Sequence, residues 1–185
     1  MIKVNSLDIA IVEQKLGSFK NKAPTAISRA LNRAAANAKT NTSKKVREGY
    51  NIKAKTIRET IDVNKANKNK LRSSVKSKGE KVSLSKFKVS PANPRPTRPP
   101  KVLKVSVKKD TGLKEILGAF VANINGNKVF ERTTKSRLPI KQLYGPAVPQ
   151  MLGNEVVRKS IEEEARKTYL TRLEHEINRV LEKSK

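Results

Sequence analysis

An excess of positive charge constrains this 185-residue chain more than any other feature. Its 42 Lys and Arg residues against 16 Asp and Glu residues give a formal net charge of +26 at pH 7. Charges of one sign at this density repel one another in a compact fold, so we expect an acidic partner to balance them. Residues 1–109 hold 28 basic and 6 acidic residues, net +22, whereas residues 110–185 hold 14 and 10, net +4. The first part of the chain should therefore carry the surface that meets this partner.

The composition permits a hydrophobic core of modest size. A compact fold of this length buries roughly 70% of its unfolded surface. Hydrophobic residues make up 36% of the chain, aromatic residues 4%, and there is no Trp, so the core should be mostly aliphatic. We expect one domain over residues 1–185, further stabilised by oligomerisation.

The residues that most enzymes need are scarce. The chain has no Cys, which excludes disulfide scaffolds, thiolate zinc sites and cysteine nucleophiles. Its single histidine, His175, lies between Glu174 and Glu176 on the polar side of a predicted helix, where no nucleophile accompanies it. The six acidic residues of the basic part form no convincing catalytic pair. We predict that the protein is not an enzyme and has no catalytic residue, no metal site and no cofactor.

No segment of the sequence predicts export or a membrane span. Asp8 and Glu13 interrupt the apolar stretch near the N-terminus, so a secretion signal is not expected. The uncharged segment Ile116–Asn127 is far shorter than the ~20 residues that cross a bilayer. We expect a soluble protein without a membrane partner.

Residues 1–61 should be helical. Ser6 is suited to cap a first helix that ends near Leu16 before Gly17, and a shorter third helix is predicted from Lys53 to Ile61. Between them, Pro24 suits the start of a long Ala-rich helix over Thr25–Arg47, and Gly49 suits its end.

The long helix should have one apolar and one basic face. At 100° per residue its apolar positions cluster on one side, at Ile27, Ala30, Leu31, Ala34 and Ala38. Four cations fall within about 60° of one another on the other side. They are Arg29, Arg33, Lys44 and Arg47.

Residues 62–109 should form basic, irregular strands and loops. Val82, Leu84, Phe87 and Val89 suggest short strands, and Leu103, Val105 and Val107 suggest another. Five prolines within residues 91–100 predict an extended connector between them.

The last two parts of the chain are a hairpin region and a helix. In residues 110–153, Asn125-Gly126 predicts the turn of an antiparallel hairpin between Phe120–Ile124 and Val129–Arg132. Prolines and glycines between Leu138 and Gly153 favour a shaped loop over long regular structure. Residues 154–185 should form a long amphipathic helix that Asn154 caps. Its apolar stripe consists of Val157, Ile161, Ala165, Tyr169, Leu173, Ile177, and Val180 or Leu181. The fold class is therefore α+β, with a small, mainly antiparallel sheet.

The densest basic run lies between Lys65 and Lys88, where nine cations accompany a single acid, Glu80. Alternate residues of a strand share a face, so these cations would form ladders suited to a phosphate backbone. The residues that we assign to this contact are Lys68, Lys70, Arg72, Lys76 and Lys78, together with the four cations of the long helix. DNA or RNA, an acidic protein surface and plain solvation all remain open for the run. Since aromatic residues are not interleaved with the cations, any nucleic-acid binding should be independent of sequence.

Four segments carry a resemblance to a known family. They are Arg29–Ala36 (RALNRAAA), Val46–Lys55 (VREGYNIKAK), Thr97–Pro100 (TRPP) and, the longest, Lys135–Asn154 (KSRLPIKQLYGPAVPQMLGN). In these segments the chain resembles the prophage minor tail protein Z family over about Ala26 to Ile177. The order of elements is also similar to that of the tail-completion proteins of long-tailed phages.

The resemblance implies a structural virion protein that is made in the bacterial cytoplasm. It would complete the tail at its head-proximal end, where head and tail join, and would form a ring with the tail's sixfold symmetry. Its partners would be other copies of itself and neighbouring tail or connector rings. The charge adds a separate hypothesis, that the basic helix face and the lysine run line a channel and hold the end of the packaged double-stranded DNA. For protein contacts we select the loop residues Arg137, Leu138, Tyr144, Gly145 and Pro146. The rival interpretation is a cellular protein that binds nucleic acid without sequence preference, since the charge alone fits both.

Overall fold

The computed structural model describes residues 2–3, 6–94, 102–153 and 155–183, which form two compact units. We call residues 1–42, 61–77 and 153–185 the helical unit, and residues 43–60 and 78–152 the β unit. Helix α2 (Ala23–Gly49) contributes residues up to Thr42 to the helical unit and the remainder to the β unit.

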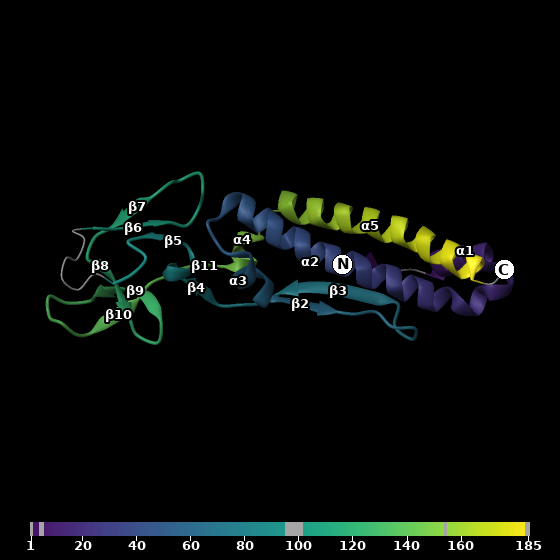
Figure 1. The fold of residues 1–185 in the computed structure, drawn as a ribbon, viewed down its shortest axis with the longest axis horizontal. Coiled ribbons are helices and arrows are strands. Elements are labelled where there is room, and N and C mark those ends of the chain that lie inside the picture. Colours follow the sequence, from purple (N-terminus) through teal and green to yellow (C-terminus); the bar gives the residue numbers. More distant parts are fainter. Residues whose placement is uncertain (1, 4–5, 95–101, 154, 184–185) are drawn as a thin grey trace. The chain divides into compact units, whose positions relative to one another are not determined.

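The helical unit combines long helices with a small antiparallel sheet (Figure 1). Its helices are α1 (Ser6–Leu16), the short 3₁₀ helix η1 (Gly17–Lys22), the first part of α2, and α5 (Glu155–Glu182). Its strands are β1 (Ile2–Lys3), β2 (Ile61–Asn64) and β3 (Arg72–Ser77), in the order β1-β3-β2. Strands β2 and β3 form a hairpin in which Val63 pairs with Val75.

Helix α2 lies at the centre of the helical unit, where its polar side chains contact α5 and the β2–β3 hairpin. On one side, Arg29 contacts Glu176 and Asn41 contacts Glu164, so α5 runs antiparallel to α2, as Figure 1 also shows. On another side, the Asn32 side chain exchanges two hydrogen bonds with the backbone of Ala66, 2.8 and 3.0 Å long, in the loop between β2 and β3. Lys39 Nζ donates to the carbonyl of Ile61 over 3.1 Å.

The core of this unit is aliphatic, as its composition requires. Most of it comes from the apolar face of α2 and from facing residues of α1 and α5. Burying each large aliphatic side chain contributes roughly 1.5–3 kcal/mol. Its buried members include Val12, Leu16, Ile27, Leu31, Ala34, Tyr169 and Ile177.

The β unit contains three small sheets and two short helices. A meander of β8 (Ala119–Asn123), β9 (Asn127–Arg132) and β10 (Ile140–Gln142) forms one sheet in the order β10-β9-β8. Strands β5 (Lys88–Ser90), β6 (Leu103–Ser106) and β7 (Lys114–Ile116) form the second in that order. Strands β4 (Lys81–Ser83) and β11 (Tyr144–Ala147) pair in the third. The remaining elements are α3 (Ala54–Glu59), α4 (Val148–Met151) and the 3₁₀ turn η2 (Leu84–Lys86).

The predicted α+β class is confirmed, as are the first helix, the long Ala-rich helix and the C-terminal amphipathic helix. The hairpin at Asn125-Gly126 is confirmed as well, because both residues have the positive φ angles, 51° and 94°, that such a turn needs. The expected apolar stripe of α5 is buried or partly buried throughout, and the exposed faces of that helix are polar for the most part.

Four local predictions are wrong. Residues 1–61 are not helical throughout, because Ile2–Lys3 form the strand β1. The third helix ends at Glu59, so Ile61 begins β2. Leu84 lies in the 3₁₀ turn η2 and not in a strand. The segment from Leu138 to Gly153 contains β10, β11 and α4, so it is more regular than a loop. Ile61 pairs with Ser77 of β3, the N–H of Leu84 donates to the carbonyl of Leu143, and β11 pairs with β4; local sequence patterns do not reveal such partners.

Two sequence expectations fall on residues outside the described ranges. They are the capping role of Asn154 and most of the proline connector, residues 95–101. Within the ranges that are described, none of the helices combines the length and the apolar composition that a bilayer span requires.

Candidate nucleic-acid interface

The four cations predicted on the basic face of α2 are all exposed residues. Arg29 and Arg33 belong to the helical unit, and Lys44 and Arg47 belong to the β unit. The apolar residues predicted on the opposite face, Ile27 to Ala38, are buried. The two-faced character of the helix is thus confirmed, while the proposed binding role of its cations stays a prediction.

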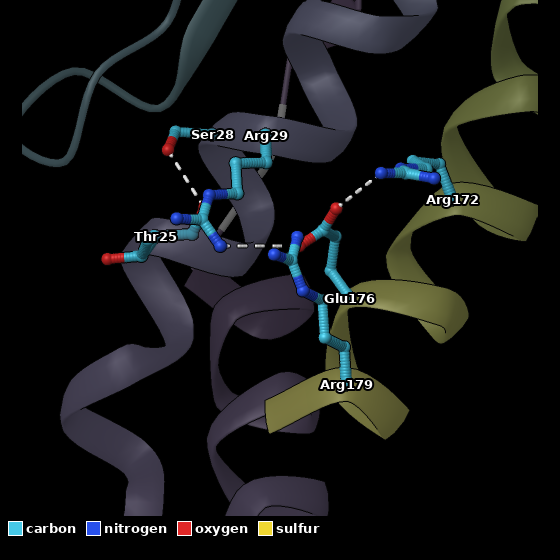
Figure 2. A network of polar contacts seen from close by, with 6 residues as sticks. All are labelled: Thr25, Ser28, Arg29, Arg172, Glu176 and Arg179. Carbon is cyan, nitrogen blue, oxygen red and sulfur yellow. Dashed lines mark hydrogen bonds and ion pairs between the residues drawn. The ribbon is translucent and has the colours of Figure 1, made fainter. Parts of the chain in front are cut away.

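Arg29 is engaged in an ion-pair network inside the helical unit (Figure 2). Its Nη1 lies 3.5 Å from Oε2 of Glu176, a carboxylate whose side chain is only 1% exposed. Arg172 approaches the other oxygen, Oε1, at 2.8 Å, and Arg179 Nη1 lies 3.8 Å from Oε2. Three partly exposed guanidinium groups therefore surround one buried carboxylate, which leaves the cluster with a net charge of +2.

Glu176 was not among the predicted site residues, although the sequence contains a signal for it. Glu176 follows Tyr169 by seven residues, so it lies on the buried stripe of α5. Arg172 and Arg179 flank it at spacings of four and three residues, which bring side chains together on a helix. A carboxylate on an apolar stripe with arginines at both spacings indicates a buried ion pair.

The predicted ladder of Lys68, Lys70 and Arg72 is wrong in part. Lys68 and Lys70 lie in the loop between β2 and β3, and only Arg72 and Lys76 lie on the strand β3, four residues apart on one face. All four are exposed, and the two bonds between Asn32 and Ala66 hold this lysine-rich loop against α2. Lys78 follows in the β unit, where its backbone N–H donates to the carbonyl of Thr60 over 2.8 Å.

A basic pocket of about 320 Å³ lies around Arg47 in the β unit. Its walls are brought together by strand pairing and hydrogen bonds between segments that are far apart in the sequence. Ser106, at the end of β6, is the register partner of Lys88 in β5 and accepts a 2.7 Å hydrogen bond from Asn51 Nδ2. The backbone N–H of Asn51 donates to the carbonyl of Val107 over 2.9 Å, so the segment after α2 lies next to residues 106–108.

Among the described residues, five cations and no acid line this pocket. They are Arg47, Lys53, Lys86, Lys88 and Lys109. Tyr50 and Phe87 also line it, Phe87 being 7% exposed. Cations grouped without counter-charges attract phosphate groups and raise the local concentration of a polyanion. We name this group the Arg47 pocket; it is the best candidate for a nucleic-acid interface in the β unit.

Of the predicted contact residues, only Arg47 lines this pocket. Lys86 and Lys88 belong to the basic run found in the sequence, but Lys53 and Lys109 carried no local signal because they come from separate segments. Arg33, Lys44 and the cations of the β2–β3 hairpin lie outside this pocket.

A second basic pocket, of about 260 Å³, lies in the helical unit next to the Glu176 network. We name it the Arg29 pocket. Its lining contains four cations and one hydroxyl, and the apolar residues Ala26 and Val180 complete it. The polar residues are Lys22, Thr25, Arg29, Arg179 and Lys183.

A sequence profile of one family, prophage minor tail protein Z (GPZ), matches residues 4–184, nearly the entire chain. The chain belongs to this family. Neither the curated proteins nor the solved structures yielded a match to it. Family membership makes the chain a minor tail protein of a phage and therefore a structural component of the virion.

The segment selected for protein contacts in this minor tail protein is largely at the surface. Leu138 and Tyr144 are 66% and 51% exposed, and Arg137 is exposed as well. Gly145 is different, because a Cβ atom added there would lie 2.7 Å from Cε2 of Phe87. It allows β11 to approach the aromatic ring in the wall of the Arg47 pocket, so it has a packing function. The contact role of the five residues stays a prediction.

A groove of about 700 Å³ lies between α1 and residues 159–177 of α5 in the helical unit. Its walls expose the apolar residues Ile11 and Leu170, which are 45% and 52% accessible. Its charged lining residues are four acids and three cations. The acids are Asp8, Glu162, Glu163 and Glu174, and the cations are Lys15, Lys159 and Arg166. Tyr169 lies at the groove, and burial raises its pKa to about 12, with a smaller contribution from the charge of Asp8.

Within the described part of the chain, no group of His, Cys, Asp and Glu has the arrangement of a metal site. His175 is exposed on α5, at the position expected from the sequence. The cations that line the two basic pockets favour electrostatic attraction of anions.

Proposed function

We propose that this minor tail protein completes the phage tail at its head-proximal end and is needed for joining the tail to the head. The match to the minor tail protein Z family over residues 4–184 carries this proposal. In it, both units act as one tail-completion domain, and copies of the chain form a ring that follows the sixfold symmetry of the tail.

In this proposal the Arg47 pocket contacts the end of the packaged DNA. Its five cations come from three separate segments, and its lining holds no acid. Contacts to phosphates position a protein on DNA without reading its sequence, which suits a protein that meets whichever DNA end is packaged. An acidic neighbouring ring is the competing partner for the same cations.

Complementation of a phage that lacks this gene tests the tail role. Unjoined heads and tails should accumulate in the deletion, and the wild-type gene should restore infectious particles, both counted by electron microscopy and plaque assay. Normal particles from the deletion would refute the proposal.

The contact with DNA is tested in the same assay by charge reversal. Arg47→Glu with Lys109→Glu should lower the yield of infectious particles, whereas the matched pair Lys114→Glu with Lys141→Glu, which lies on exposed strand positions of the same unit, should not. Both pairs should leave the unfolding temperature unchanged, because the substituted side chains are exposed. Equal yields from the two pairs would exclude the Arg47 pocket from this role.

For the ring, we propose that the groove between α1 and α5 receives a basic surface of a second copy. The groove combines exposed apolar residues with four acids and three cations, so its lining has a net charge of −1, while the chain as a whole has a net charge of +26. Charge complementarity of this kind steers association between copies. Sedimentation velocity of Leu170→Glu should show a loss of oligomer relative to the wild type, with Lys167→Glu as the control on an exposed face of α5. An unchanged oligomer in Leu170→Glu would contradict this contact.

A further inference from the structure

We infer that the Arg29 pocket of the helical unit is a binding site for a phosphate group. Four cations and a hydroxyl line a cavity of about 260 Å³, which is smaller than the 300–1,000 Å³ typical of sites for drug-sized ligands. The size suits one small anion, and the lining chemistry selects a phosphate, because guanidinium groups donate paired hydrogen bonds to its oxygens and ammonium groups add charge.

The buried carboxylate of Glu176 holds the arginines of this pocket in place. Arg172 makes the shortest contact to the carboxylate, 2.8 Å to Oε1, and does not line the pocket. Arg29 and Arg179, which do line it, share Oε2 at 3.5 and 3.8 Å (Figure 2). Each guanidinium group has five N–H donors, so these two long contacts leave donors available for an anion.

The charges around the pocket favour an anion. Arg29 and Arg179 converge on one oxygen, which places two like charges close together, and one carboxylate cannot neutralise both along with Arg172. Lys22 and Lys183 add two more cations at the pocket wall. Thr25 and Arg29 belong to the first turns of α2, whose dipole is positive at this end. Arg179 and Lys183 counter the negative end of α5, which closes the other side. An anion bound there would reduce the repulsion among these groups.

Two sources of phosphate share this chemistry: free inorganic phosphate and the phosphodiester backbone of DNA. Only the second depends on the proposed contact with packaged DNA, so the site is first tested with inorganic phosphate alone. We expect titration of the full-length protein to shift the Nε–H resonances of Arg29 and Arg179 saturably. The variant Lys22→Gln with Lys183→Gln, which leaves the ion pairs of Glu176 in place, should bind phosphate about tenfold more weakly, a loss that corresponds to two charge-assisted contacts.

The matched control is Lys20→Gln with Lys167→Gln, which removes the same charge from exposed positions of η1 and α5 outside the pocket. This control should retain wild-type phosphate affinity. A short DNA duplex is then added to the phosphate-saturated protein, and displacement of phosphate from Arg29 and Arg179 identifies the DNA backbone as the natural source. If the duplex does not displace phosphate, the site is assigned to the free anion. Absence of saturable shifts, or equal affinity in the two double variants, would overturn the inference whatever the result for the Arg47 pocket.

Discussion

The two basic pockets contain similar side chains but balance their charge in different ways. In the Arg29 pocket, a buried carboxylate contacts two of the four cations and fixes their positions. In the Arg47 pocket, five cations converge without an acid in the lining, and backbone pairing around Ser106 supports the walls. The difference indicates that some cations of this chain contact a buried acid within the fold, whereas the cations of the Arg47 pocket have no acid beside them in the described lining. Net charge alone does not separate the two.

The largest expected effect is on the stability of the helical unit. Glu176→Gln should lower the free energy of unfolding by about 2–3 kcal/mol, because it removes the charge from a carboxylate that three arginines contact. The loss is smaller than for a fully buried pair because the arginines are partly exposed. Urea denaturation measures it. Glu174→Gln, exposed on the same helix, is the control and should change stability by less than about 0.5 kcal/mol. Equal stability of the two variants would contradict a structural role for the network.

A comparable test for the β unit is Gly145→Ala. The added methyl group would lie 2.7 Å from Phe87 Cε2, so we expect a loss of about 1–3 kcal/mol as the ring or β11 moves. Gly49→Ala, whose added Cβ would meet no atom within 4 Å, is the control and should be close to neutral. Wild-type stability of Gly145→Ala would show that this close approach does not shape the pocket wall.

The buried hydroxyl of Tyr169 makes the stability of the helical unit dependent on alkaline pH. Its pKa rises from 10.0 in the unfolded chain to about 12 in the fold, mainly through burial. Between these values the unfolded state releases the proton first, so stability is fully present below pH 10 and decreases by about 2 kcal/mol as the pH approaches 12. Tyr169→Phe should lack this component of the decrease. Identical pH profiles of variant and wild type, measured by urea denaturation, would contradict it.

A smaller loss of stability is expected when the hydrogen bonds between α2 and the lysine-rich loop are removed. Asn32→Ala removes both hydrogen bonds to Ala66 and should cost about 1–2 kcal/mol. Faster amide exchange in residues 65–71 would show that the tie is local. Asn37→Ala on the same helix is the control, since Asn37 accepts only a bond from Asn41 within α2. Unchanged exchange in Asn32→Ala would mean that other contacts hold the loop.

Sequence patterns predicted the helices and the hairpin that are determined by residues close together in the sequence. The 3.6-residue period indicated α2 and α5, and Asn125-Gly126 indicated its hairpin, because each depends on residues within a few positions. The Arg47 pocket was not predictable in this way. Lys53, Lys88 and Lys109 meet only because residues 49–51 and β5 lie beside the end of β6, and such pairings depend on the fold as a whole.

The Glu176 network depends partly on local spacing, as α2 and α5 do, and partly on long-range packing, as the Arg47 pocket does. Spacing along α5 contains a signal for the contacts of Glu176 with Arg172 and Arg179, although we did not predict them, and the approach of Arg29 required the packing of two helices that are far apart in the sequence.

The measurement that tests the central claim most directly is the salt dependence of binding to a random-sequence DNA duplex between roughly 50 and 200 mM salt. Each phosphate contact contributes about 0.9 to the slope of log K against log salt. Lys88→Gln with Lys109→Gln should therefore reduce the slope by about 1.8. The matched pair Lys114→Gln with Lys141→Gln, on exposed strand positions of the same unit, should leave it unchanged. Equal slopes for both pairs, or no binding by the wild type at low salt, would contradict the assignment of the Arg47 pocket to DNA.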